Sequence, residues 1–249
     1  MNAIYIFWLR QLKRFWRSRS RIIGSLGQPI LFLVALGFGF GPIYQKAGEG
    51  NYLQFLVPGV IGMSLLFSAI FFGIELIWDK QFGFLKETMV APVPRFYIML
   101  GRTLGGATVA TIQGLLVFTL SFAVGFRITS WALLPAAILV MFLIAILFTA
   151  LGTAIATVLQ DMHGFQLIMS FLVMPLFFLS GAIFPLNSAP KALVMVAKID
   201  PLSYGVDGLR ATLIGDSYFH FGLDLTVLAV LSFLFLALGS FLFTKMEVK

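Results

Sequence analysis

The stretch FLVPGVIGMSLLFSAIFFGIELIW, residues 55–78, decides the class of fold. It contains one charged residue, Glu75, and it exceeds the roughly 20 apolar residues that a helix needs to cross a hydrocarbon core of about 30 Å. Similar runs recur along the chain, whereas a soluble protein with one buried helix would show one. The sequence therefore predicts an all-α membrane protein with six transmembrane helices.

We expect a single transmembrane domain over residues 1–249, with spans at 22–41, 55–78, 98–126, 131–159, 165–184 and 223–244. Hydrophobic residues make up 60% of the chain and charged residues 11%, against roughly 25% charged in ordinary soluble domains. The absence of cysteine excludes disulfides, thiolate metal sites and cysteine nucleophiles. No cleavable signal peptide is expected, because the N-terminus lacks a basic region followed by a short apolar stretch and a small-residue cleavage site.

After the quoted run comes DKQFGFLKETMVAPVPRFYIMLGR, residues 79–102, a compact segment of mixed charge. Apolar residues at helical spacing predict a short helix in its first half. Pro92 and Pro94 end that helix, because proline lacks an amide proton and disfavours helix at the residue before it. Gly101 and Gly105 then give a small-residue packing face as the third span begins. Residues 79–97 are interpreted either as an ordinary cytoplasmic loop, which the pattern alone favours, or as a rigid element that transmits motion to the two spans that it joins.

The positions of lysine and arginine set the expected orientation. Twelve of the 17 basic residues lie before the first span, between the second and third spans, just inside the third span (Arg102), or in the C-terminal tail. The other five lie in the alternate loops. Because cytoplasmic loops carry the excess of lysine and arginine, both termini and residues 79–97 are expected in the cytoplasm. The net charge of +7 then fits anionic lipid headgroups, and nucleic acid is not an expected partner.

Residues 1–21 are expected to form an amphipathic helix at the membrane interface. Arg10, Arg14 and Arg17 share one face, whereas Trp8 and other apolar residues share the opposite face. Arg19 falls on the wrong face, so the helix is expected to end or bend near residues 18–20. The helix is interpreted either as a simple anchor or as part of a docking surface shared with residues 79–97.

Two short amphipathic helices are expected on the outer side, within residues 186–215. Gly181 and Pro185 break the fifth span near the outer face, and Asp200 followed by Pro201 predicts the start of the second short helix. Asp207 and Arg210 lie three residues apart and are expected to be able to pair. One interpretation of these helices is a passive lid on the bundle.

Few polar residues interrupt the spans. Glu75 lies near the cytoplasmic end of its span and is expected to pair with Lys80 or Arg102, or to act in coupling or cargo handling. Gln28, Gln113 and Gln166 are expected to line a pathway or to join helices by hydrogen bonds. No metal site is expected, since Asp161 and His163 in one short loop are too few ligands.

Two motifs carry a resemblance to a known family. Asp79, Gly83, Glu87, Pro92-Val93-Pro94-Arg95 and Gly101-Arg102 resemble the cytoplasmic coupling region of type-2 ABC transporter permeases. The second and more specific motif is Phe178–Pro185, followed by Pro190 and Asp200–Arg210; it resembles that family's signature after the fifth span. Within the family the chain is most similar to the daunorubicin-resistance and nodulation-factor exporter branch.

The resemblance implies a permease subunit that forms a homodimer and binds a separate ATP-binding subunit, which carries ATP and Mg²⁺. It assigns coupling to the ATPase to Asp79, Gly83, Glu87, Pro92, Pro94, Arg95 and Arg102. It implies that the two short outer helices are re-entrant and help to close the exit of the pathway. It assigns this outer gate to Gly181, Pro185, Pro201, Tyr204, Asp207 and Arg210. The residues agree on one point: no lysine follows a glycine, so the chain has no phosphate-binding P-loop and no cofactor site of its own is expected.

The expected function is therefore the membrane subunit of an ATP-driven exporter in the plasma membrane, with no enzyme activity on this chain. The scarcity of charges within the spans favours a hydrophobic, amphiphilic or lipid-linked substrate. A polysaccharide exporter permease of the same family and an ion-gradient-driven secondary transporter are the alternatives. The latter class usually carries carboxylates or histidines near mid-bilayer, and here no charged residue falls at a predicted span centre. A non-transporting membrane scaffold is a third possibility.

Overall fold

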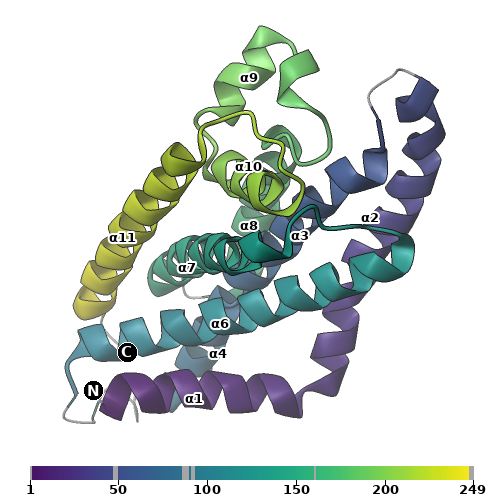
Figure 1. Cartoon of the computed structure of the whole chain (residues 1–249). Coiled ribbons are helices and arrows are strands. Elements are labelled where there is room, and N and C mark those ends of the chain that lie inside the picture. The colour runs from purple at the N-terminus through teal and green to yellow at the C-terminus, as the bar shows by residue number, and fades with distance from the viewer. Residues whose placement is uncertain (1, 47–49, 86–89, 91–92, 160, 247–249) are drawn as a thin grey trace.

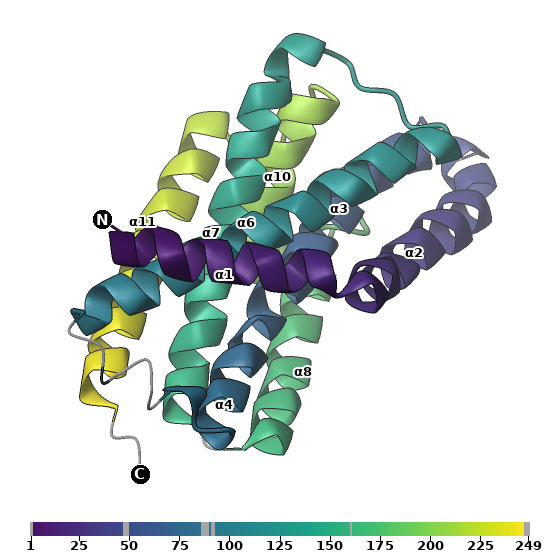
Figure 2. The same cartoon turned by 90° about the horizontal axis from the view of Figure 1, so that it is seen from below.

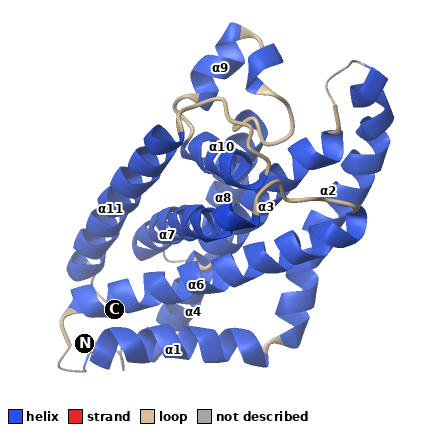
Figure 3. Cartoon of the chain, in the orientation of Figure 1, coloured by secondary structure: helices blue, strands red, loops and turns tan. Residues whose placement is uncertain are grey.

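The structure is a computed structural model, and it describes residues 2–46, 50–85, 90, 93–159 and 161–246. Nearly all of these residues are helical, and none of them forms a strand (Figure 3). The α-helices are α1 (Asn2–Arg17), α2 (Arg19–Lys46), α3 (Tyr52–Phe71), α4 (Gly73–Gln81), α6 (Arg95–Ser121), α7 (Leu134–Val158), α8 (Met162–Leu179), α9 (Lys191–Ala197), α10 (Pro201–Leu213) and α11 (Phe221–Lys245). Short 3₁₀ turns lie at Phe122–Val124, Trp131–Leu133 and Leu186–Ser188.

Six stretches of the described chain are long and apolar enough to cross a membrane: Arg19–Lys46, Tyr52–Gln81, Arg95–Val124, Trp131–Val158, Met162–Leu179 and Phe221–Lys245. The predicted all-α class with six membrane-spanning helices is therefore confirmed. The second stretch is two helices in series, α3 and α4, separated at Phe72. The chain also turns at Ser18, between α1 and α2, and so places Arg19 at the start of a new helix.

The central helix of the bundle is α3. In the most apolar part of the stretch Tyr52–Gln81, 78% of the residues are buried, and α3 packs against α2, α6, α7 and α10. By contrast, only 17% and 22% of the residues are buried in the most apolar parts of α2 and α8. These two helices therefore lie at the edge of the bundle and leave apolar side chains such as Phe38 and Phe171 exposed.

Glycines bring the centre of the bundle close together. A Cβ atom on Gly73 would lie 2.4 Å from the carbonyl oxygen of Gly152, and one on Gly152 would lie 2.4 Å from that of Ile70. The backbone of α7 thus touches the junction of α3 and α4 directly, as small residues allow at helix interfaces in membranes. This contact fixes where α4, which carries Glu75, leaves the core.

Helix α1 lies across the bundle rather than along it and packs on α6 (Figure 2). A Cβ atom on Gly101 would lie 2.8 Å from the carbonyl oxygen of Ile4, and one on Gly105 would lie 2.8 Å from Cβ of Gln11. The small-residue face predicted at the start of the third span therefore receives α1, not another span.

The two ends of the bundle differ. Helix α1 and the C-terminal end of α11 lie on the same side of the molecule, whereas α9 lies at the opposite end (Figure 1). Helix α10 follows α9 and packs against α3, α7 and α11. One end of the bundle thus carries α1 and the segment after α4, and the other carries the short helices that follow α8.

Candidate functional site

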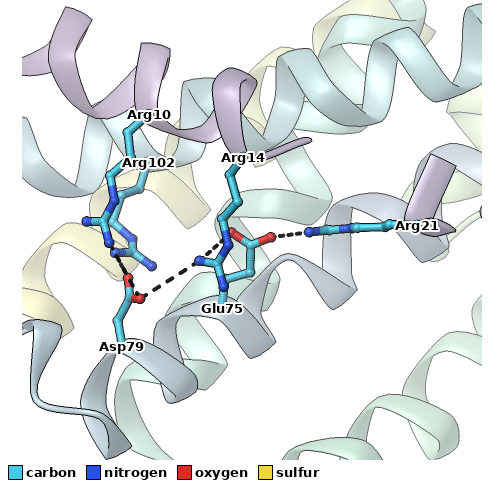
Figure 4. Close-up of polar contacts among 6 residues, drawn as sticks. All are labelled: Arg10, Arg14, Arg21, Glu75, Asp79 and Arg102. Carbon is cyan, nitrogen blue, oxygen red and sulfur yellow. Dashed lines mark hydrogen bonds and ion pairs between the residues drawn. The ribbon is translucent and has the colours of Figure 1, made fainter. Parts of the chain in front are cut away.

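Charged side chains from four helices meet where α1 crosses the bundle (Figure 4). We call this group the arginine–carboxylate cluster. It consists of Arg10 and Arg14 from α1, Arg21 from α2, Glu75 and Asp79 from α4, and Arg102 from α6. Four guanidinium groups thus face two carboxylates, which leaves the cluster with a formal charge of +2.

Asp79 and Arg102 form the buried centre of the cluster. Nη1 of Arg102 donates to Oδ2 of Asp79 at 2.6 Å, and their side chains are 1% and 5% exposed, respectively. Oδ1 of Asp79 lies 3.8 Å from Nη2 of Arg10 and 3.9 Å from Nη1 of Arg14. Because a buried charge needs a partner, this pair ties α4 to α6 and draws α1 onto both.

Glu75 binds the two arginines that flank the turn between α1 and α2. Its Oε1 accepts a hydrogen bond from Nη1 of Arg21, and its Oε2 lies 3.5 Å from Nη1 of Arg14. The predicted pairing of Glu75 with Lys80 or Arg102 is therefore wrong. The turn at Ser18 folds α1 back toward α4, which brings Arg14 and Arg21 to Glu75 from more than 50 residues away.

The rest of α1 is also held by the protein. The indole N–H of Trp8 donates to Oγ1 of Thr108 on α6 at 3.0 Å, and Phe15 is buried. Trp16 and Arg17 point outward and are exposed. Four residues were predicted for the interfacial helix. Trp8, Arg10 and Arg14 contact other helices of the bundle, whereas Arg17 is exposed.

Lys80 caps the C-terminal end of α7. Its Nζ donates to the carbonyl oxygens of Ala156, Thr157 and Leu159 at 2.8, 2.7 and 3.1 Å. The last carbonyls of a helix lack partners within the helix, and a lysine is a suitable donor for them. The sequence contains no signal for this contact, because Lys80 and Ala156 are 76 residues apart.

Replacing Lys80 by methionine is expected to destabilise the protein by about 2 kcal/mol, since hydrogen bonds to a charged group contribute about 1.5–3 kcal/mol. The free energy of unfolding of the purified protein in detergent micelles measures this. Lys191 on α9 is exposed, and its replacement by methionine serves as the control with no expected change. Equal effects of the two substitutions would contradict the role of Lys80.

Several residues predicted to couple to an ATPase bond within the chain. Gly83 follows α4 with φ of 77°, a left-handed conformation that favours glycine after a helix. Nη1 of Arg95 donates to the carbonyl oxygens of Thr244 and Met246 at 2.6 and 3.3 Å, and so closes α11. Pro94 is the residue before α6. Glu87 and Pro92 lie outside the described residues.

At the other end of the bundle, the turn after α8 is hydrogen-bonded to α10. Gly181 turns the chain with φ of 75°, and Nη2 of the buried Arg210 donates to the carbonyl oxygens of Gly181 and Ala182 at 2.7 and 3.2 Å. The same guanidinium lies 3.8 Å from the ring centroid of Phe55. Arg210 therefore joins α10 to the turn after α8 and to α3.

Asp207 and Arg210 do not form the direct pair that their spacing predicted. The carboxylate of Asp207 accepts the backbone N–H groups of Tyr218 and Phe219 at 2.8 and 2.7 Å and thus secures the loop before α11. Tyr204 donates its hydroxyl to the carbonyl oxygen of Lys198 at 2.7 Å. Asp207 and Arg210 therefore each bond to backbone groups and not to each other.

The two prolines of the outer motif lie at helix starts. Pro201 is the first residue of α10, and Asp200 caps this helix by accepting the N–H of Leu202 at 2.8 Å, as predicted. Pro185 precedes the 3₁₀ turn at Leu186–Ser188. Burial raises the pKa of Asp200 to about 7, although the hydrogen bond from Leu202 acts in the opposite direction. Burial also lowers the pKa of Arg210, to about 10, so Arg210 stays charged at neutral pH.

The three glutamines predicted to lie within spans have different surroundings. Gln113 on α6 is buried and donates to Oγ of Ser25 on α2 at 2.9 Å. Gln28 on α2 and Gln166 on α8 are exposed, and both belong to helices at the edge of the bundle. The structure therefore supports helix joining for Gln113 and leaves Gln28 and Gln166 on open faces.

Known proteins place the chain in a family. The sequence model described as "ABC-2 type transporter" matches residues 2–214. The chain belongs to the ABC-2 type transporter family. It is 26% identical to nodulation protein J of Rhizobium leguminosarum bv. viciae, over 86% of this chain and 84% of that protein. It is 27% identical to the inner membrane transport permease YadH of Escherichia coli strain K12, over 86% and 83%. It is also 28% identical to the putative transport permease ycf38 of Cyanophora paradoxa, over 84% and 73%.

The chain is therefore a multi-pass transport permease, as both these relatives and the six apolar helical stretches of its described residues indicate. The match to the ABC-2 family spans every residue of the arginine–carboxylate cluster and the whole of α10. Both ends of the bundle described above therefore lie within the part of the permease that the family shares.

Proposed function

We propose that this ABC-2 permease is the membrane subunit of an ATP-driven exporter, with both termini in the cytoplasm. ATP is hydrolysed on a separate ATP-binding subunit, because family membership implies that subunit and this chain has no P-loop lysine. The observation that carries the proposal is the arginine–carboxylate cluster. It joins α1, α2, α4 and α6 at the end of the bundle next to the segment between α4 and α6.

The ATP-binding subunit docks on that segment and on the outward face of α1. Phe82 and Val90 are 67% and 84% exposed, and apolar side chains this open are typical of an interaction surface. Asp79 lies three residues before Phe82 and is bonded to Arg102. Because this bond links α4 to α6, a movement of the segment displaces both helices together.

Two copies of the permease and the surrounding lipids complete the transporter. The exposed faces of α2 and α8 are apolar but carry Gln28 and Gln166, and polar side chains that face lipid are costly. A second copy covers these faces and encloses a pathway for a hydrophobic, amphiphilic or lipid-linked substrate. The exposure of Trp16 and Arg17 supports a position of α1 at the membrane interface. The outer helices α9 and α10 close the exit.

Co-purification with candidate ATP-binding subunits tests the proposal. The permease is expected to form a stable complex whose ATP hydrolysis responds to the permease. Replacing Phe82 by alanine is expected to weaken the complex at least about tenfold, as loss of an aromatic side chain at the centre of an interface does. Trp131 is 64% exposed and lies in the loop that follows the far end of α6, so its replacement by alanine is the matched control.

Two results would contradict the proposal. One is a permease that binds no ATP-binding subunit yet moves substrate down an imposed ion gradient, which indicates a secondary transporter. The other is equal weakening of the complex by the Phe82 and Trp131 substitutions, which removes the segment after α4 as the docking surface.

A further inference from the structure

One carboxyl group at the beginning of α11 is fully buried and has no partner. Helix α11 begins beside α10, at the end of the bundle opposite α1 (Figure 1). Asp224 lies in the first turn of α11 and is 0% exposed. Neither of its carboxylate oxygens has a hydrogen-bond partner or an ion pair among the described residues. An ionisable side chain in such a position within a span is a functional group by default.

The helices packed around Asp224 bring no positive charge to it. Helix α10 presents Tyr204 and Asp207, and both interact electrostatically with Asp224. A Cβ atom on Gly208, in the same turn of α10, would lie 3.6 Å from Cβ of Asp224. Helix α7 contains no titratable residue. Three residues of α6 are titratable, and they lie toward the end of the bundle that carries α1: Arg95, Tyr97 and Arg102.

The basic residues at the outer end are engaged elsewhere or exposed. Arg210 donates to the carbonyl oxygens of Gly181 and Ala182, on the side of α10 that faces α3. His220 caps α11 by accepting the N–H of Gly222 at Nδ1, so this nitrogen carries no proton. The remaining described basic residues at this end are exposed: Lys46, Arg127, Lys191 and Lys198. A negative charge on Asp224 would therefore be buried without compensation.

The surroundings of Asp207 and Asp224 decide which of the two carries a proton. Burial raises the pKa of Asp207, but hydrogen bonds from the N–H groups of Tyr218 and Phe219 act in the opposite direction, as does the charge of Arg210. Asp224 has no such donors. The N-terminus of α11 favours a negative charge, but this effect is smaller than the cost of burying an unpaired ion. Because neighbouring carboxylates also repel each other, the proton belongs on Asp224.

We propose that Asp224 binds a proton while α11 packs on α10, and that separation of these helices at the outer end releases it. Loss of the proton leaves two negative charges at the contact around Gly208 and drives the helices apart. Asp207 holds the loop before α11, so the separation also moves this loop. The outer end is therefore closed more tightly in acidic than in alkaline surroundings. Only the identification of this contact with the exit rests on the function proposed above; the bound proton does not.

Infrared spectroscopy detects the proton directly. The experiment uses the full-length permease in phosphatidylcholine nanodiscs at neutral pH, with no ATP-binding subunit present. Asp224→Asn has the shape of a protonated carboxyl group but cannot ionise. This variant is expected to lose the C=O band of one protonated carboxylic acid, whereas Asp216→Asn, the same change at an exposed position, keeps it. An unchanged band in Asp224→Asn would show that Asp224 is ionised and would overturn the proposal.

The pH dependence of stability counts the same proton. The unfolded chain has an ionised Asp224 above about pH 5, whereas the folded protein keeps the group protonated, so folding binds one proton and stability falls as the pH rises. From about pH 5 to about pH 7, the equilibrium constant of unfolding is expected to rise about tenfold per pH unit relative to that of Asp224→Asn. The other carboxyl groups are common to both proteins and cancel in this ratio. A ratio that is independent of pH would overturn the proposal.

Hydrogen exchange reports the separation of the helices. In alkaline buffer, the N–H groups of Tyr218 and Phe219 are expected to exchange severalfold faster in the unchanged protein than in Asp224→Asn, because the intrinsic exchange rate is the same in both. Equal rates would show that the proton does not hold α11 on α10. Slowing by sodium ions in the unchanged protein alone would identify a bound cation in place of the proton. Since no ATP-binding subunit takes part, failure of the exporter proposal in co-purification leaves these results unaffected.

Discussion

Replacing Arg102 by methionine is expected to lower the free energy of unfolding of the permease by about 3 kcal/mol. Removal of one partner from a buried ion pair typically costs about 3–5 kcal/mol, because the remaining charge stays buried without compensation. Arg102 is 1% exposed and donates to Asp79 at 2.6 Å. We expect the lower end of the range because Arg10 and Arg14 lie 3.8 and 3.9 Å from the same carboxylate.

A double-mutant cycle measures this interaction. Asp79→Asn combined with Arg102→Met is expected to cost less than the sum of the two single substitutions, because neither leaves an unpaired charge in the other's presence. Arg127 is exposed, and Arg127→Met is the control, expected to change the free energy of unfolding by less than about 0.5 kcal/mol. If Arg102→Met behaves like Arg127→Met, or if the cycle is additive, the pair does not hold α4 to α6.

The same variant separates stability from coupling. At a temperature where the Arg102→Met protein remains folded, its complex with the ATP-binding subunit is expected to form, because Phe82 and the surface of α1 are unchanged. The response of ATP hydrolysis to the permease is expected to fall, because α4 and α6 are no longer linked through Asp79. In the proposed exporter, exposed side chains bind the ATP-binding subunit and buried side chains transmit its movement.

Features of the chain that depend on neighbouring residues could be predicted from sequence. Span number follows from the length and apolar character of each run, and the described part of the chain has six such helical stretches. The start of α10 follows from Asp200 and Pro201, since an aspartate caps the helix and a proline needs no amide partner there. These features need no knowledge of how the helices pack.

Partners of the buried polar groups could not be predicted, because they depend on packing between distant helices. Glu75 binds Arg14 and Arg21, which are 61 and 54 residues away, although Lys80 is only five residues away. Lys80 instead binds carbonyl groups at the end of α7, which have no side-chain signature. Asp207 and Arg210 have the spacing of a helical ion pair, yet unpaired backbone groups nearby provided partners for both.

Gly101 and Gly105 show the intermediate case. Their four-residue spacing predicts a face for close helix packing, and such a face is present. Which helix occupies the face was not predictable, because the sequence gives no sign that residues 1–21 pack there as well as lying at the membrane interface. The turn at Ser18 decides the matter by directing α1 back across the bundle, where Trp8 also bonds to Thr108.

Replacing Gly152 by leucine is expected to prevent assembly of the bundle. A Cβ atom at this position would lie 2.4 Å from the carbonyl oxygen and 2.9 Å from Cα of Ile70, near the end of α3, and these backbone atoms cannot rotate away as a side chain can. Overpacking of a core typically costs about 1–3 kcal/mol and more where the backbone must move. We expect a cost above that range, measured as loss of monodisperse protein on size-exclusion chromatography in detergent.

The control is Gly39→Leu on α2, where a Cβ atom meets nothing within 4 Å. It is expected to elute and unfold as the unchanged protein does. Gly152→Ala introduces the Cβ atom alone and is expected to lie between the two. Should Gly152→Leu instead elute and unfold like Gly39→Leu, α7 does not approach α3 as closely as described.

The Gly152→Ala variant also connects the core to the arginine–carboxylate cluster. Gly73, the first residue of α4, is itself in contact with Gly152, so any movement of α7 there displaces α4. Glu75 and Asp79 follow on the same short helix, and they hold Arg14, Arg21 and Arg102. Gly152→Ala is therefore expected to reduce the response of ATP hydrolysis to the permease, as Arg102→Met does, from a site that touches neither the cluster nor the ATP-binding subunit.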